Sequence, residues 1–119
     1  MARLCKGAVM QKASLTALAR EQLKIAREAS NGRGARTVFG GHEHVLRQTV
    51  IALAAGHRLD EHANPGEATV FVLSGRVRMA SGGAEWEGSP GDLLTVPDAP
   101  HSLDGIEDSA VLLTVAKRG

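Results

Sequence analysis

The sequence predicts an all-β domain preceded by a single α-helix. From residue 35 onward, short apolar stretches alternate with turn-forming residues at the spacing that is typical of β-sandwiches and barrels. Most of the 14 glycines stand in these turns. A helical period of apolar residues is confined to residues 14–30. The expected architecture is therefore one helix followed by one antiparallel β unit.

The helix is expected between Ser14, a plausible N-cap, and Ser30, ahead of the stop signal Asn31-Gly32. One face is expected to hold the larger apolar residues, with two small residues beside it. These positions are Leu15, Leu18, Gln22, Ile25 and Ala29, with Ala19 and Ala26 beside them. We expect the Leu15, Leu18 and Ile25 face to pack onto the barrel or onto a second subunit, because isolated helices of this length are marginal in water.

The strands are expected where apolar residues alternate between turns. The candidates are residues 35–39, 45–54, 69–73, 76–80, 84–87, 92–96, 101–103 and 110–115. Glycine, proline, asparagine and serine clusters separate them. No linker divides the chain, so we expect residues 1–34 to form an arm and helix and residues 35–119 to form the barrel.

Composition excludes several classes of function. The formal charge is +1 and aromatic residues make up 3% of the chain, so it lacks both the basic field and the stacking platforms of nucleic-acid-binding proteins. No apolar run approaches the length of a membrane span. Cys5 is the single cysteine, which leaves no intrachain disulfide and no zinc-binding cysteine pair. We expect a cytoplasmic protein with no nucleic-acid or membrane partner.

The stretch HANPGEATVFVLSG, from His62 to Gly75, raises the question of a metal site. His62 and Asn64 are two residues apart at the mouth of a strand, so they would face the same side. Two histidines there, with a carboxylate and His101 on a neighbouring strand, would form an open site for zinc, iron or manganese. An asparagine amide is a weak ligand for these ions. Asn-Pro-Gly is also a strong turn former, and turn formation is the favoured interpretation of Asn64.

Residues 56–104 resemble a cupin domain. The segment GHRLDEHANPGEATVFVLSG is similar to the first cupin motif, and GDLLTVPDAPHSL is similar to the second. The matching positions are Gly56, His62, Gly75, Gly91, Pro97 and His101. The resemblance implies a double-stranded β-helix, a jelly-roll-like barrel, with the helix outside it. It also implies a homodimer, since small cupins often pair through edge strands.

The metal ligands that the resemblance implies are incomplete. Asn64 stands where metal-binding cupins carry a second histidine, and Ala68 stands where they carry a glutamate. Glu67 is one residue away, and only a β-bulge would turn it to the same face. His62 and His101 alone predict weak or absent binding of zinc, iron, manganese or nickel.

Two functions remain open from the sequence, besides a purely structural module. The first is a barrel cavity for a small-molecule ligand, lined by His62, Asn64, His101 and Gln48. The alternative is a metal-dependent enzyme, isomerase or dioxygenase-like, that uses His62 and His101. Trp86 is expected to close a hydrophobic end of the barrel, and His42-Glu43-His44 is interpreted as an exposed turn despite its ligand-like spacing.

Overall fold

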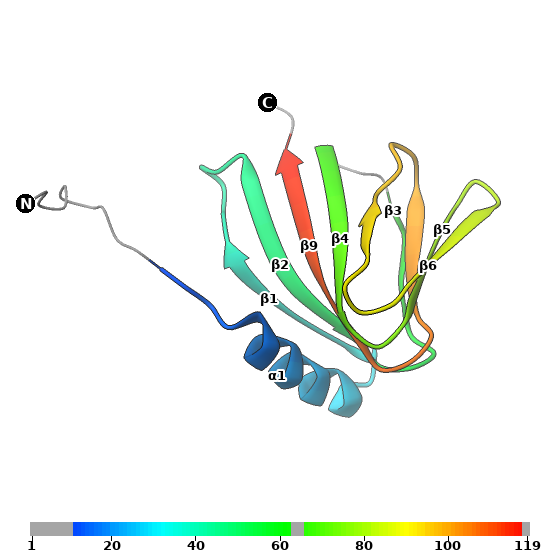
Figure 1. Ribbon diagram of the computed structural model, residues 1–119, viewed down its shortest axis with the longest axis horizontal. Coiled ribbons are helices and arrows are strands. Elements are labelled where there is room, and N and C mark those ends of the chain that lie inside the picture. Colours follow the sequence, from blue (N-terminus) through cyan, green and yellow to red (C-terminus); the bar gives the residue numbers. More distant parts are fainter. Residues whose placement is uncertain (1–10, 63–65, 118–119) are drawn as a thin grey trace, which may run out of the picture.

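The computed structural model describes residues 11–62 and 66–117, with the backbone alone at residues 61 and 62. One helix and nine strands lie within these residues (Figure 1). Their bounds are α1 (Leu15–Glu28), β1 (Arg33–Phe39), β2 (Leu46–Leu53), β3 (Arg58–His62), β4 (Gly66–Ser74), β5 (Val77–Ser81), β6 (Ala84–Gly88), β7 (Leu93–Thr95), β8 (His101–Gly105) and β9 (Ser109–Lys117). In the described ranges, no helix combines the length and the apolarity needed to cross a membrane.

The strands form two antiparallel sheets that face each other. A five-stranded sheet has the order β1-β2-β9-β4-β7, and a four-stranded sheet has the order β3-β8-β5-β6. From β2 to β9 the chain changes sheet at every connection except the one between β5 and β6, which are neighbours in the four-stranded sheet (Figure 1). This arrangement confirms the predicted all-β fold with one N-terminal helix.

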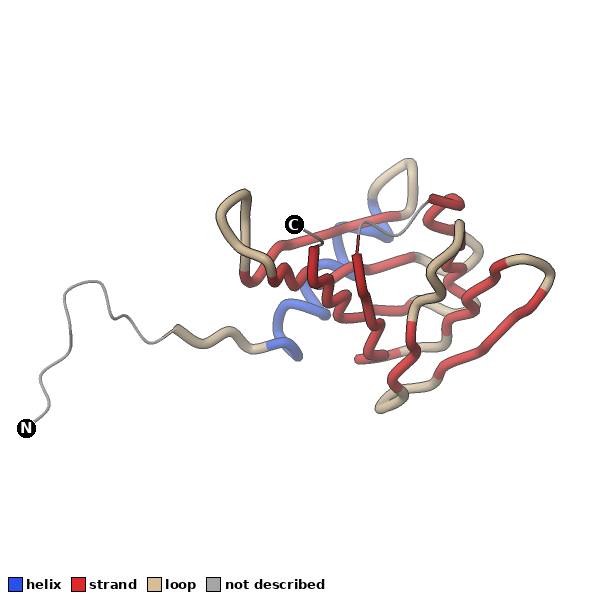
Figure 2. Tube along the Cα trace, turned by 90° about the horizontal axis from the view of Figure 1, so that it is seen from above, coloured by secondary structure: helices blue, strands red, loops and turns tan. Residues whose placement is uncertain are grey.

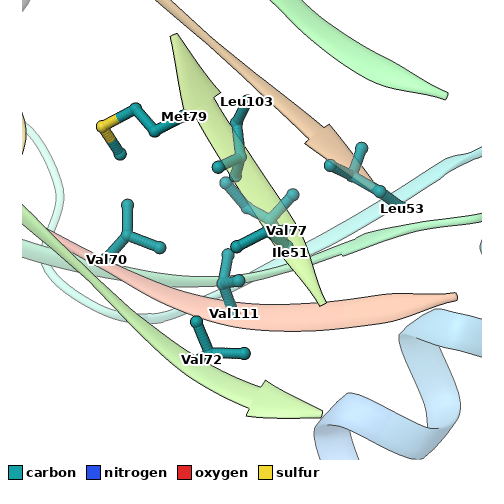
Figure 3. Packing of buried hydrophobic residues seen from close by; sticks show 8 residues of the cluster. All are labelled: Ile51, Leu53, Val70, Val72, Val77, Met79, Leu103 and Val111. Carbon is teal, nitrogen blue, oxygen red and sulfur yellow. The ribbon is translucent and has the colours of Figure 1, made fainter. Parts of the chain in front are cut away.

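The main core fills the space between the two sheets. Alternate residues of each strand point inward because successive side chains in a strand face opposite sides. The eight buried members of the core are Ile51, Leu53, Val70, Val72, Val77, Met79, Leu103 and Val111 (Figure 3). The core is aliphatic apart from the thioether of Met79, as the low aromatic content required.

Helix α1 packs on the outer side of the five-stranded sheet, away from the β5–β6 hairpin (Figure 2). Ser14 caps it as predicted: its hydroxyl oxygen accepts a hydrogen bond of 3.2 Å from the amide of Ala17. The helical face was predicted less well, because Ile25 is 46% exposed. The residues that meet the sheet are small residues and one leucine, namely Ala19, Leu23 and Ala26 against Ala52, Ala110 and Leu73. Paired alanines let the two backbones approach closely, and Ile25 would hold them apart.

Strand β3 was absent from the prediction. Arg58 and Asp60 are charged and exposed, and Leu59 is the one apolar residue of the segment, so the sequence lacks the apolar alternation that is typical of a strand. Tertiary pairing supplies what the sequence pattern lacked: Arg58 and Leu59 pair with Asp104 and Leu103 of β8. The guanidinium of Arg58 also donates to the carboxylate of Asp104 at 2.6 and 3.1 Å. The other predicted strands are present, with shifts only at their ends.

Candidate functional site

His101 begins strand β8 and occupies the inner face of the four-stranded sheet. Leu103, two residues along the same strand, belongs to the buried core, so alternation places His101 on the same face. The imidazole residue is 7% exposed. Its Nδ1 lies 2.9 Å from the carbonyl oxygen of Ala99, in the loop that leads into the strand. The interior therefore holds a buried, oriented histidine at one end of the core.

The partner of Nδ1 fixes the protonation of the neutral His101 ring. A carbonyl oxygen can only accept, so Nδ1 carries the proton and donates to Ala99. In this tautomer Nε2 is an acceptor, able to bind a metal ion or to accept a hydrogen bond. A backbone carbonyl on the far nitrogen is also the usual way in which a metal-binding imidazole is oriented. The geometry of His101 thus suits either kind of ligand.

Pairing between the backbones of β3 and β8 places His62 opposite His101. His62 is the last residue of β3 and is the register partner of His101 in β8. A register shift between Leu59 and His62 precedes this pair. The two motif histidines, far apart in the sequence, thus stand at opposed positions of neighbouring strands. Asn64, the third predicted site residue, lies outside the described residues.

Ala68 occupies the inner face of β4, and Glu67 does not. Ala68 alternates with the buried Val70 and Val72. Glu67 is exposed and pairs with Ala116, and the register with β9 continues unbroken from Gly66 to Val72. The described part of β4 therefore contains no bulge that would turn the Glu67 carboxylate inward.

The described donors do not make a transition-metal centre of the usual kind. Such a centre needs at least three histidine, cysteine, aspartate or glutamate ligands. Among residues 11–60 and 66–117, whose side chains the structure describes, no group of three such side chains is placed to hold an ion. At the position where a carboxylate would face His101, the chain has the methyl group of Ala68.

Gln48 lies on the other side of the five-stranded sheet, which corrects its assignment to the barrel cavity. It shares its face of β2 with Ala52, which packs against the helix. Its side-chain Nε2 donates to Oγ1 of Thr114 at 3.1 Å. It also lines an outer hollow of about 320 Å³ with Leu15 and Leu112. The sheet thus separates Gln48 from His101.

Met79 and Trp86 are inner-face residues that the sequence analysis did not place beside His101. Met79 is the register partner of both Leu103 and Trp86. The alternation of Val77, Met79 and Ser81 along β5 was the available signal, but it does not tell which strands are neighbours. Trp86 was expected to close an end of the barrel; it is 46% exposed.

The His42-Glu43-His44 segment lies in the loop between β1 and β2. All three residues are exposed, in agreement with the interpretation as a turn. The ring of His44 stacks edge-on against Phe39, with 5.0 Å between the ring centres. The contact gives His44 a local packing partner on the outside of the molecule.

The comparisons with known proteins agree with this architecture. A family model described as the cupin domain matches residues 49–116. No protein with a curated description matches the chain. A conserved protein of unknown function from Streptococcus pyogenes is 27% identical in sequence, with a TM-score of 0.68; the match covers 76% of this chain and 79% of the other.

Two further solved structures extend the comparison. An RmlC-like cupin from Desulfovibrio desulfuricans is 25% identical, with a TM-score of 0.62 and coverage of 71% of this chain and 81% of the other. The salicylate 1,2-dioxygenase of Pseudoaminobacter salicylatoxidans is 23% identical, with a TM-score of 0.70; the match covers 85% of this chain and 31% of the enzyme, and it shows a shared fold alone. From the matched family model and this shared architecture, the chain belongs to the cupin family.

Proposed function

We propose that the protein binds a small organic molecule at the His101 end of its interior, without holding a metal ion tightly. The observation that carries the proposal is the buried imidazole of His101 on an apolar inner face, where Ala68 replaces the carboxylate of metal-binding cupins. A pocket of this kind, mostly apolar with a few polar groups, is the usual form of a small-molecule site.

A groove of about 480 Å³ also borders Ala68, but most of its lining lies on the outer face of the five-stranded sheet, as with Glu67, Thr69 and Thr114. Thr69 and Thr114 are register partners on the face opposite to the buried Val70 and Val72. This groove is therefore separate from the proposed site beside His101.

One observation favours the second candidate, a metal-dependent enzyme. The hydrogen bond from Nδ1 of His101 to Ala99 leaves Nε2 as the acceptor, which is the arrangement of a metal-binding imidazole. Under this alternative, His62 and His101 would hold the ion together with a third ligand outside the described residues. A DMSP lyase from Ruegeria pomeroyi, 21% identical to this chain, shares the fold alone.

A ligand screen on the wild type and two histidine variants tests the proposed function. Thermal unfolding is followed with a chemically diverse set of small molecules, in the presence of a chelator. We expect at least one compound to raise the Tm of the wild type and of His42→Ala, an exposed loop variant, but not of His101→Ala. Stabilisation that needs added metal, and disappears with the chelator, would favour the enzyme; stabilisation unaffected by His101→Ala would place the site elsewhere.

We also propose that the protein is a cytoplasmic homodimer. Three large apolar residues are exposed on its surface: Phe39 by 42%, Leu46 by 39% and Leu93 by 60%. Phe39 and Leu93 lie on β1 and β7, the edge strands of the five-stranded sheet. A second copy would cover such residues. The lone Cys5, which has no intrachain partner, is compatible with a reducing compartment. Light scattering across a dilution series tests the dimer.

A further inference from the structure

Trp86 belongs by position to the inner face of the molecule, although it lies on an edge strand. It is the register partner of Met79, which is 1% exposed and part of the core. Directly paired residues of antiparallel strands share one face of the sheet. Its neighbours Glu85 and Glu87 lie on the other face, within 3.8 and 3.9 Å of the guanidinium of Arg78. The indole therefore borders the same interior as His101.

The two sheets separate between Gly88 and Trp86. At Gly88, an added Cβ would lie 3.0 Å from a methyl carbon of Val72 and 3.2 Å from one of Leu94, so the sheets touch there. Trp86 faces the same side two residues earlier along the strand, yet it is 46% exposed. The facing sheet leaves about half of this large apolar side chain in water.

The path from Trp86 to His101 is short enough for one small ring compound. Strand β5 lies between β6 and β8, so two strand spacings, or about 10 Å, separate the two backbones across the sheet. Trp86 is level with Leu103, so His101 is also offset by two residues, or about 7 Å, along the strand. Met79 and Ser81 occupy the inner face of β5 along this path. The side chains of Trp86 and His101 themselves bridge part of that distance. A single ring with one substituent therefore reaches from one to the other.

We propose that Trp86 is a stacking surface for a flat aromatic or heteroaromatic ring, and that the ligand of this protein carries such a ring. This inference rests on the proposed function and names the chemical class of its ligand. A planar ring contacts the whole indole face and gains the attraction between aromatic rings, whereas a puckered ring of equal size gains only burial.

Fluorescence is a direct probe of this inference. Trp86 is the single tryptophan and the chain has no tyrosine, so the emission reports this one side chain. Phenol and cyclohexanol are matched in size and in their hydroxyl group, and differ in planarity. Each is titrated up to its solubility, with calorimetry as the second measurement. We expect phenol to quench the emission and to bind about fivefold more tightly than cyclohexanol, the ratio that one aromatic pair supplies.

Three variants separate stacking from burial. Trp86→Leu should lose the preference for phenol, and Trp86→Phe should keep most of it. Val45→Ser, which removes an exposed apolar side chain from the loop before β2, should leave the preference unchanged. Circular dichroism checks that each variant is folded, and calorimetry replaces fluorescence where the tryptophan is absent.

Several results would overturn the inference. These are equal affinity for the two alcohols, a preference that survives in Trp86→Leu, and no binding of phenol at any concentration. An emission that changes on dilution of the protein but not with phenol would assign Trp86 to an interface between two copies. If compounds from the screen still stabilise the wild type but not His101→Ala, the proposed function stands and only the aromatic ligand class fails.

Discussion

His62 and His101 are register partners across strands β3 and β8, although 38 residues separate them in the sequence. Each begins or ends its strand, so the pair marks the end of the four-stranded sheet where the chain enters β8 and leaves β3. Ala68 lies on the inner face of the opposite sheet. New metal ligands would therefore have to lie near this pair of histidines, for example at Ala68 on the opposite sheet.

We predict that restoring the missing donors will tighten metal binding. The double variant Asn64→His, Ala68→Glu adds an imidazole and a carboxylate to the pair of motif histidines, which gives the four donors of a typical centre. Zinc titration by calorimetry should show weak or undetectable binding in the wild type and stoichiometric binding in the double variant. Glu67→Ala serves as the control, because an exposed carboxylate on the outer face should not matter. Tight stoichiometric zinc in the wild type would refute the prediction.

A second prediction concerns the acid stability that Asp108 provides. Its pKa is lowered, first by the hydrogen bond from Arg27 of α1 and then by the amide of Ala55. A lowered pKa means that the stabilisation is complete above the unfolded value and is lost as the pH falls through the folded value. Because the pair is largely exposed, Asp108→Asn should cost about 1 kcal/mol or less at pH 7.

The difference in unfolding free energy between the wild type and Asp108→Asn should shrink below about pH 4, where the carboxyl group of the unfolded chain begins to protonate, and should vanish as the pH falls through the lower pKa of the folded state. Urea unfolding at several pH values measures it. A double-mutant cycle with Arg27→Gln isolates the ion pair from the Ala55 hydrogen bond. A difference that stays constant down to pH 3 would contradict the prediction.

A third prediction tests the contact between α1 and the five-stranded sheet. Ala26, Ala52 and Ala110 are each 0% exposed, so the interface has no room for a larger side chain. Ala26→Leu should destabilise the protein by about 1–3 kcal/mol, as overpacked sites do. Ile25→Ala, one residue away on the exposed side, should change stability by less than about 0.5 kcal/mol. Urea unfolding compares the two, and equal effects would mean that the helix is not held at Ala26.

The fourth prediction compares two glycines that both have positive φ. Gly75 has a φ of 77° and Gly82 has a φ of 56°. A Cβ at Gly75 would lie 2.2 Å from the carbonyl oxygen of Asp108 and 2.3 Å from the hydroxyl oxygen of Ser109, whereas one at Gly82 would meet nothing within 4 Å.

Alanine at Gly82 therefore costs only the backbone strain, about 1–2 kcal/mol. Alanine at Gly75 adds a collision with a turn whose buried Ser109 hydroxyl donates to the carbonyl oxygen of Arg76 at 2.8 Å. Gly75→Ala should thus be the more destabilising of the two in thermal unfolding. The opposite order would show that the turn relaxes without cost.

The sequence by itself determined the fold class, the helix and most strands, because these follow from local periods and from turn residues. The alternation around Val70 and Val72 predicts which residues of β4 point inward, and Ser14 predicts the start of α1. Two motif histidines also predicted one end of the candidate site. Each of these features depends on residues that are near one another in the chain.

Only the tertiary structure decided the rest, because it depends on which strands become neighbours. Pairing with β8 made a strand of the charged segment around Arg58, and the packing of alanine on alanine turned Ile25 to solvent. The arrangement of the strands placed Gln48 on the outer face of the five-stranded sheet, and it placed Trp86 beside Met79 on the inner face of the four-stranded sheet. Contacts between distant segments override local pattern wherever that pattern is weak, and the candidate site is assembled almost entirely from such contacts.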